Sequence, residues 1–256
     1  MYALTGVAII PDGVTSIEKN ILTRAARIDK VIIPTSVTSI GEWAFSDCTS
    51  LTSVSIPDSV TSIGEFAFCH CISLLSIAIP DSMTEIKNFA FNQCSSLTSI
   101  SIPDSVVAIG HEAFSYCCNL TSIAIPDSVT SIGDNAFSNC SQLTGISIPH
   151  SVTMFGADAF YHCTNMTSIS FDRPKLINWS EKAFSSNKEI KSIRFSDATT
   201  SIPASFCDEM LGLKEVLIPN QVTSIGAFAF RRCKSLTSIN IPDSVVSIGQ
   251  SAFCLC

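Results

Sequence analysis

The stretch LTSVSIPDSVTSIGEFAFCHCIS, from Leu51 to Ser73, decides the fold, because close copies of it recur along the chain. Proline marks the period, since within two runs each proline follows the previous one by 23 residues. The first run is Pro11, Pro34, Pro57, Pro80, Pro103, Pro126 and Pro149, and the second is Pro219 and Pro242. A fixed period of this length predicts an array of stacked structural repeats.

The spacing inside one unit predicts its shape. Leu51, Val54 and Ile56 alternate with polar residues as in a short β-strand, and the proline that follows cannot donate to a strand ladder. A second extended piece is expected over residues 60–63, and the return segment through Phe68 has room for no more than one helical turn. A single coil cannot bury its own apolar side, so the units must stack. We therefore predict a mainly β repeat solenoid of about eleven such coils, with irregular or single-turn helical return segments.

A glycine follows the second extended piece in most units, and this position suggests a turn that requires a positive φ. Its members are Gly41, Gly64, Gly110, Gly133, Gly156, Gly226 and Gly249.

The repeats form one domain over residues 1–256, regular over about 9–170 and 218–256 and irregular over about 171–217. In the irregular part the spacing from Pro149 to Pro219 is one residue more than three periods, so one residue has been inserted. Trp179 appears there, and the cysteine of the regular units is expected to be replaced by Asn187 and Glu209. Such a segment is a natural place for a specific contact, although sequence drift without function is the favoured explanation.

The pattern L-x-x-I-x-I-P-x-x-V-x-x-I-G-x-x-A-F-x-x-C resembles the BspA-type leucine-rich repeats, and five consecutive units over residues 34–148 match it almost position by position. The resemblance implies a right-handed leucine-rich-repeat superhelix in a cell-surface or secreted protein used for attachment. It supplies no catalytic residues. The start of the chain shows no signal peptide, and the chain stops in mid-repeat, so we expect it to be a fragment or the repeat region of a longer protein. No apolar stretch approaches the roughly 20 residues that span a bilayer.

Cysteine is concentrated at one repeat position. A column of cysteines in successive coils fits small buried hydrophobic residues better than disulfide pairs or a zinc site, whose ligands must converge on one point. The column is Cys48, Cys71, Cys94, Cys117, Cys140, Cys163, Cys233 and Cys256. Cys207 lies off the column and is expected to be the most exposed thiol. So many unpaired cysteines are also compatible with an intracellular, reducing compartment.

Two further columns allow alternative interpretations. Aspartate follows proline at Asp12, Asp58, Asp81, Asp104, Asp127 and Asp243. This row could bind a divalent cation, but Asp and Ser after Pro are more typical of residues that hold a turn through local backbone hydrogen bonds. Regular Thr and Ser positions could meet ice or polysaccharide, although these residues are also the default on a β-sheet surface.

Charge is distributed unevenly along the chain. Residues 31–170 carry eleven acidic residues and one basic residue, whereas residues 171–234 hold ten of the fifteen basic residues. Basic residues near Trp179 could contact an anionic partner. The candidate partner-binding residues are Arg173, Lys175, Trp179, Lys182, Lys191 and Arg194. A net charge of −7 argues against nucleic acid and leaves a protein or glycan partner.

The chain shows no constellation typical of an enzyme. The four histidines lack metal-site spacing, and a nucleophile elbow, a P-loop and a G-x-G-x-x-G motif are missing. We expect no catalytic residues, metal or cofactor. The sequence therefore predicts a non-enzymatic recognition or adhesion module, with a structural or assembly segment of a larger protein as the alternative.

Overall fold

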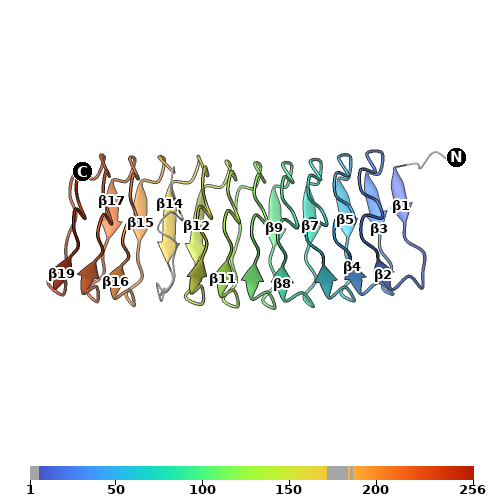
Figure 1. Ribbon diagram of the computed structural model, residues 1–256, viewed down its shortest axis with the longest axis horizontal. Coiled ribbons are helices and arrows are strands. Elements are labelled where there is room, and N and C mark those ends of the chain that lie inside the picture. Colours follow the sequence, from blue (N-terminus) through green and yellow to red (C-terminus); the bar gives the residue numbers. More distant parts are fainter. Residues whose placement is uncertain (1–5, 172–183, 185–186) are drawn as a thin grey trace.

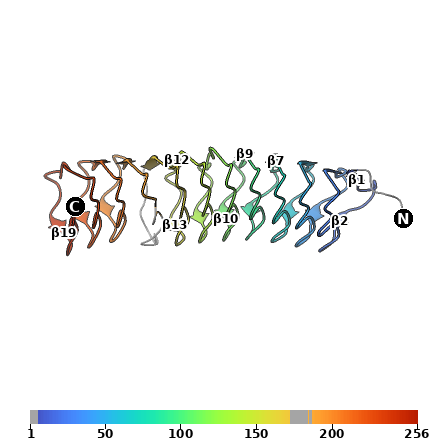
Figure 2. The ribbon, with the colours of Figure 1, turned by 90° about the horizontal axis from the view of Figure 1, so that it is seen from above.

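The computed structural model describes residues 6–171, 184 and 187–256. The coils stack into a rod with the two chain ends at opposite extremities (Figures 1 and 2). The first strand position of the coils recurs eleven times, from Ala8 to Ile239, so the chain makes about ten complete turns. The described residues contain strands and turns but no helix, which confirms the predicted solenoid with irregular return segments.

Most regular coils contribute one strand to each of two faces, although the segments around Ile123 and Ile239 follow the same path without being strands. The first strands form a five-stranded sheet of β1 (Val7–Ile9), β3 (Lys30–Ile32), β5 (Ser53–Ser55), β7 (Ser76–Ala78) and β9 (Ser99–Ser101), and a four-stranded sheet of β12 (Gly145–Ile148), β14 (Ser168–Phe171), β15 (Ser192–Arg194) and β17 (Glu215–Leu217). The second strands form three sheets, namely β2 (Ser16–Ile17), β4 (Ser39–Ile40) and β6 (Ser62–Ile63); β8 (Glu85–Ile86), β10 (Ala108–Ile109), β11 (Ser131–Ile132) and β13 (Met154–Phe155); and β16 (Ser201–Ile202), β18 (Ser224–Ile225) and β19 (Ser247–Ile248).

All strand pairs are parallel and join neighbouring coils. Val31 pairs with Val54, which reproduces the period of the sequence. Ile169 of β14 pairs with Ile193 of β15, one residue beyond that period. The inserted residue therefore lies between these two strands.

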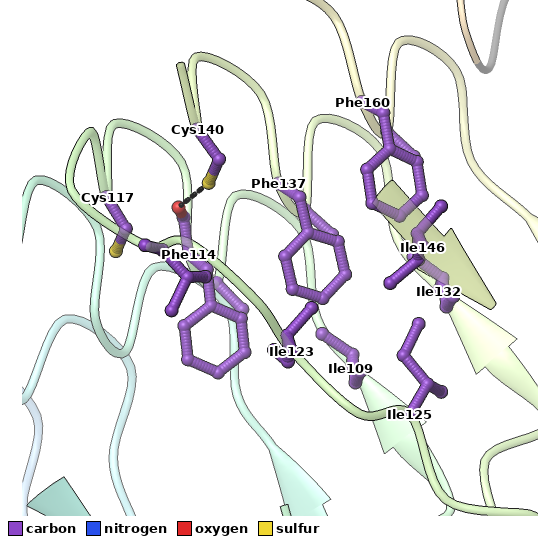
Figure 3. Close-up of a cluster of buried hydrophobic side chains, with 14 of the residues drawn as sticks. Ile109, Phe114, Cys117, Ile123, Ile125, Ile132, Phe137, Cys140, Ile146 and Phe160 are labelled. Carbon is purple, nitrogen blue, oxygen red and sulfur yellow. Dashed lines mark hydrogen bonds between the residues drawn. The ribbon is translucent and has the colours of Figure 1, made fainter. Parts of the chain in front are cut away.

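The core is a continuous column of apolar side chains that point inward from all sides of the coil. Phenylalanine rings of successive coils stack on one another, as Phe137 and Phe160 do with centroids 5.1 Å apart and planes 10° from parallel. Figure 3 shows these rings beside the isoleucines of both strand faces. Because each coil covers the apolar face of the next, burial is nearly complete, and Phe114 and Phe137 are fully enclosed.

The return segment is a chain of turns that is bonded to the next coil. The amides of Trp43, Phe45 and Asp47 donate to carbonyl oxygens 22 residues later, at 2.8–3.1 Å. Trp43 and Asp47 each have a φ of 57°, so the segment alternates between right-handed and left-handed conformations and cannot continue as a helix.

The glycine column is needed for a different reason from the one predicted. Among the described glycines only Gly6 and Gly13 have a positive φ. At Gly156 a Cβ would lie 2.3 Å from the backbone nitrogen of Asp134, and at Gly133 it would lie 2.6 Å from that of His111. At these two positions, close approach of the preceding coil and not a left-handed turn disfavours a side chain, although Glu18, Lys87 and Pro203 occupy the same repeat position in other coils.

In the irregular coils the core remains filled, but a large and a small residue have exchanged positions. Cys207 is completely buried, so the prediction of an exposed thiol is wrong: it stands where regular coils have phenylalanine, and Phe206 stands where they have alanine. Phe206 packs against the rings of Phe171 and Phe195, with centroids 5.5 and 5.6 Å away. The pair has thus exchanged its large and small members.

The column position after the insertion is Asn187 and then Met210, not Glu209. The amide of Met210 donates to the carbonyl of Cys207, just as the amide of Cys233 donates to that of Phe230. The period of 23 residues resumes at Asn187, which places Met210 in the column and Glu209 outside it. Trp179 lies outside the described residues.

Candidate functional site

The cysteine column consists of internal hydrogen-bond donors. Each thiol donates to a backbone carbonyl 26 residues earlier, and Cys140 reaches the carbonyl of Phe114 at 3.2 Å (Figure 3). Burial raises the pKa of the Cys48 thiol to about 11 and that of Cys163 to about 12. Thiols that resist ionisation are poor nucleophiles and poor metal ligands. The described cysteines that are exposed are Cys254 and Cys256, both on the last coil, so the prediction of burial holds for the other column members and is wrong for Cys256.

The aspartate row does not hold the turns. In most regular coils the serine that follows the aspartate donates across coils, as Ser59 does to the carbonyl of Val37 at 2.7 Å, whereas Ser105 has no hydrogen-bond partner among the described residues. Asp58 and its neighbours Asp81 and Asp104 are exposed, and their carboxylates take no part in the hydrogen bonds found among the described residues. Over the same residues, no group of three His, Cys, Asp or Glu side chains is placed to hold a metal ion.

The regular threonines also contribute hydrogen bonds between coils. Thr52 donates its hydroxyl to the carbonyl of Asp29 at 3.0 Å, and Thr38 donates to that of Thr15 at 3.1 Å. The outward serines of the first strands differ, because Ser53 and Ser55 are both exposed and make no such cross-coil bond, and the same pattern recurs in β9. The first strands therefore present a regular surface of small polar side chains.

The predicted partner-binding residues fall only partly within the described chain. Arg173, Lys175, Trp179 and Lys182 lie outside it. Lys191 and Arg194 are exposed, and Arg194 is the last residue of β15, beside a hollow that Asp197 also lines.

Two surface features were missed by the sequence reasoning. The first is a half-buried aromatic stack on the return segments, in which Trp43 lies 3.9 Å from Phe66, and Phe66 lies 4.3 Å from Phe89, with nearly parallel rings. The three residues stand 23 apart, and this spacing could have revealed the stack.

The second feature is an open groove of about 660 Å³ along the glycine column. It crosses β8, β10, β11 and β13, and its lining includes Gly110, Gly133 and Gly156. We call it the glycine groove. Gly110, Gly133 and Gly156 carry no side chains, so the surface is hollowed where these coils meet. Lys87 occupies the same repeat position in the coil before Gly110 and also lines the groove.

A profile of the BspA-type leucine-rich repeat region matches residues 15–144, 107–225 and 200–256, in six copies. The chain belongs to this family. It is a leucine-rich repeat module, as the sequence pattern predicted. The described residues contain no helix that is long and apolar enough to cross a membrane.

Solved structures of bacterial leucine-rich repeat proteins are similar to this module. A leucine-rich cell surface protein from Faecalibacterium prausnitzii is 30% identical, with a TM-score of 0.65 over 97% of this chain and 79% of that one. A leucine-rich repeat protein from Bacteroides ovatus is 27% identical, with a TM-score of 0.55 over 100% of this chain and 86% of the other. A comparison with curated proteins found no match.

Proposed function

We propose that this BspA-type module is a non-enzymatic recognition module, which binds a protein or glycan partner through its extended repeat surface. The observation that carries the proposal is the first-strand surface, where outward side chains are exposed and in register while every inward one is buried. The fold needs the inward residues, whereas the outward ones remain available for contact. A rigid array of such positions is typical of solenoid binding surfaces.

The relatives support a role at a surface. The similar protein from F. prausnitzii is described as a cell surface protein, and we propose the same location for this module. Adhesion through a repeat surface needs no catalytic residue, which agrees with a chain whose buried thiols ionise only at high pH.

We further propose that the irregular coils set specificity for an anionic group on the partner. The predicted residues Arg173, Lys175, Trp179, Lys182, Lys191 and Arg194 concentrate positive charge beside an aromatic side chain in the sequence. The exposure of Lys191 and Arg194 is compatible with this role.

Probing a glycan and surface-protein array with the purified chain tests both proposals. We expect a reproducible set of ligands, whose binding falls at least fivefold in Trp179→Ala and Arg173→Glu. Lys30→Glu is the matched control, because Lys30 is an exposed basic residue on the regular strand β3. If no ligand binds more strongly than it binds an unrelated control protein, the recognition function is contradicted. If all variants bind equally well, the irregular coils do not contribute to binding.

The alternative function is a structural or assembly segment, favoured by an apolar surface on the last coil. Val246 is 86% exposed and Ile248 is 51% exposed. Stacking of these residues on further repeats or on a second copy would bury them. Sedimentation of the purified chain over a range of concentrations distinguishes the cases, since assembly predicts oligomers that Val246→Lys disrupts.

A further inference from the structure

We propose that the glycine groove binds an extended polypeptide segment that carries lysines four residues apart. This inference rests on the proposed recognition function. It specifies that the ligand at this part of the surface is a cationic protein segment and not a glycan. It concerns the regular acidic coils and is independent of the irregular basic ones.

The glycine groove has an acidic lining and lies in an acidic part of the chain. Its charged lining residues are Glu65, Glu85, Lys87 and Asp134, and Lys87 is paired with Glu85 at 3.4 Å. Neither Glu65 nor Asp134 forms an ion pair among the described residues. They lie in residues 31–170, where acidic residues outnumber basic ones by eleven to one. A cationic partner is attracted by this field, whereas an anionic glycan is repelled.

The two carboxylates are held in place without being neutralised. One oxygen of Glu65 accepts a hydrogen bond from the Asn88 side chain at 3.0 Å, and one oxygen of Asp134 accepts from the amide of Ala157 at 2.7 Å. These bonds fix the side chains against the rim and leave the second oxygen of each carboxylate to accept from a ligand. A fixed acceptor loses little conformational entropy on binding.

The length of the groove selects the conformation of the occupant. Glu65 and Asp134 occupy the same repeat position three coils apart, which is about 15 Å at the usual strand spacing. In an extended chain, residues i and i+4 lie about 13–14 Å apart and point to the same face. Two lysines with this spacing place one ammonium group near each carboxylate.

The floor of the groove suits the lysine stems. Gly110, Gly133 and Gly156 add no side chains there, and Met154 at one end is 52% exposed. Lysine can lay its methylene groups along such a surface and still present its charge at the rim.

The test is a titration of the isotope-labelled chain with two blocked pentapeptides, followed by amide NMR shifts. The peptide Lys-Ser-Thr-Ser-Lys has the required spacing, whereas Lys-Lys-Ser-Thr-Ser has the same charge on adjacent residues that point apart. We expect the first to bind at least threefold more tightly and to shift the amides of 108–111 and 131–134. Equal affinity, or shifts confined to other coils, would overturn the proposal.

Matched variants separate the groove from general attraction to an acidic rod. Glu65→Gln with Asp134→Asn removes both carboxylates and keeps their hydrogen-bond acceptors, and it should weaken the first peptide at least fivefold. Asp81→Asn with Asp127→Asn makes the same change in net charge on exposed turns and should alter binding less than twofold. Equal losses in both pairs would show that the net charge alone attracts the peptide.

A bulky residue tests the groove without changing charge. Ser131→Phe fills it, whereas Ser39→Phe alters the same repeat position on β4, outside the lining. Only the first should abolish binding, and equal effects of the two would also refute the groove. If array ligands bind wild type and the groove variants alike, the groove proposal fails while the recognition function stands.

Discussion

Replacing Asn187 by cysteine should stabilise the solenoid. Asn187 occupies the cysteine column and is only 1% exposed. Its Nδ2 donates to the carbonyl of Phe160 at 2.7 Å, which is the bond that a thiol makes in the regular coils, and also to that of Phe184 at 3.1 Å. Its Oδ1 is buried and has no hydrogen-bond partner among the described residues. Leaving a buried acceptor unpaired costs about 1–3 kcal/mol.

The expected gain follows from what cysteine removes and keeps. The substitution eliminates the unpaired oxygen and retains a weaker S–H donor toward Phe160, but it loses the bond to Phe184, which contributes about 0.5–1.5 kcal/mol. The net effect is a stabilisation of about 1 kcal/mol, equivalent to a rise in Tm of about 2–4 °C for a chain of this size. Asn187→Asp should do the opposite and destabilise by about 3 kcal/mol or more, because it buries a carboxylate beside two carbonyl oxygens.

Thermal and urea unfolding would be followed in a Trp43→Phe background, which leaves Trp179 as the single tryptophan close to the altered coil in sequence. Asn165→Cys, at an exposed position, controls for the mere addition of a thiol. A repeat array need not unfold in one step, so the local tryptophan signal is the relevant one. A lower or unchanged Tm for Asn187→Cys would refute the reasoning, since it would mean that the amide oxygen costs nothing where it lies.

Three other outcomes follow from the core. Gly156→Ala should lower the free energy of unfolding by about 1–3 kcal/mol, because the added Cβ meets backbone atoms of the preceding coil. Gly145→Ala, whose Cβ meets mainly a serine side chain, should lower it by less than about 1 kcal/mol. Urea unfolding of both variants measures the difference. Phe206→Ala should lower the free energy of unfolding by about 3–5 kcal/mol. Adding Cys207→Phe should recover at least half of this loss, because it restores the order of small and large residues found in the regular coils. No recovery would contradict the exchange of large and small residues. At neutral pH, a thiol reagent should modify the two exposed cysteines of the last coil, Cys254 and Cys256, within minutes. The buried members of the column, whose pKa is raised by burial, should react only after unfolding, and their rapid modification would show that the coils open.

The strand faces and the core could be predicted from the sequence because both depend on local spacing. Val54 and Ile56 alternate with polar residues within one coil, and the period then places equivalent residues side by side. The buried cysteine column follows from the same reasoning, since a residue that recurs three positions after each phenylalanine must share its environment.

The errors arose where composition does not determine geometry. Glycine is favoured both where φ is positive and where backbone approaches closely, and the sequence cannot distinguish the two; at Gly133 only the close contact applies. Likewise, one inserted residue shifts every later assignment until strand pairing places it. The pairing of Ile169 with Ile193 places it between β14 and β15. The bond of Asn187 to the carbonyl of Phe160 spans 27 residues instead of the 26 of the cysteines, which places the insertion before Asn187, so Met210 and not Glu209 continues the column.

The candidate site was harder to predict than the fold, for a physical reason. The glycine groove is formed by the absence of side chains and is lined by residues from successive coils, so no short motif marks it. Glu65 and Asp134 are three periods apart, and only the stacking of the coils relates them.

The aspartate row shows that the acidic character of the regular coils is not required by the fold. Serines, as at Ser59, make the cross-coil bonds of the turns, and Asp58, Asp81 and Asp104 add like charges on consecutive coils. At a spacing of about 5 Å, each neighbouring pair costs up to about 1 kcal/mol even in water. The row lies at the beginning of the second strands and the glycine groove at their end, so negative charge borders this face on both sides. A surface that keeps charge at the expense of stability selects among partners by electrostatic attraction, which agrees with a cationic occupant on the regular coils and an anionic one on the irregular coils.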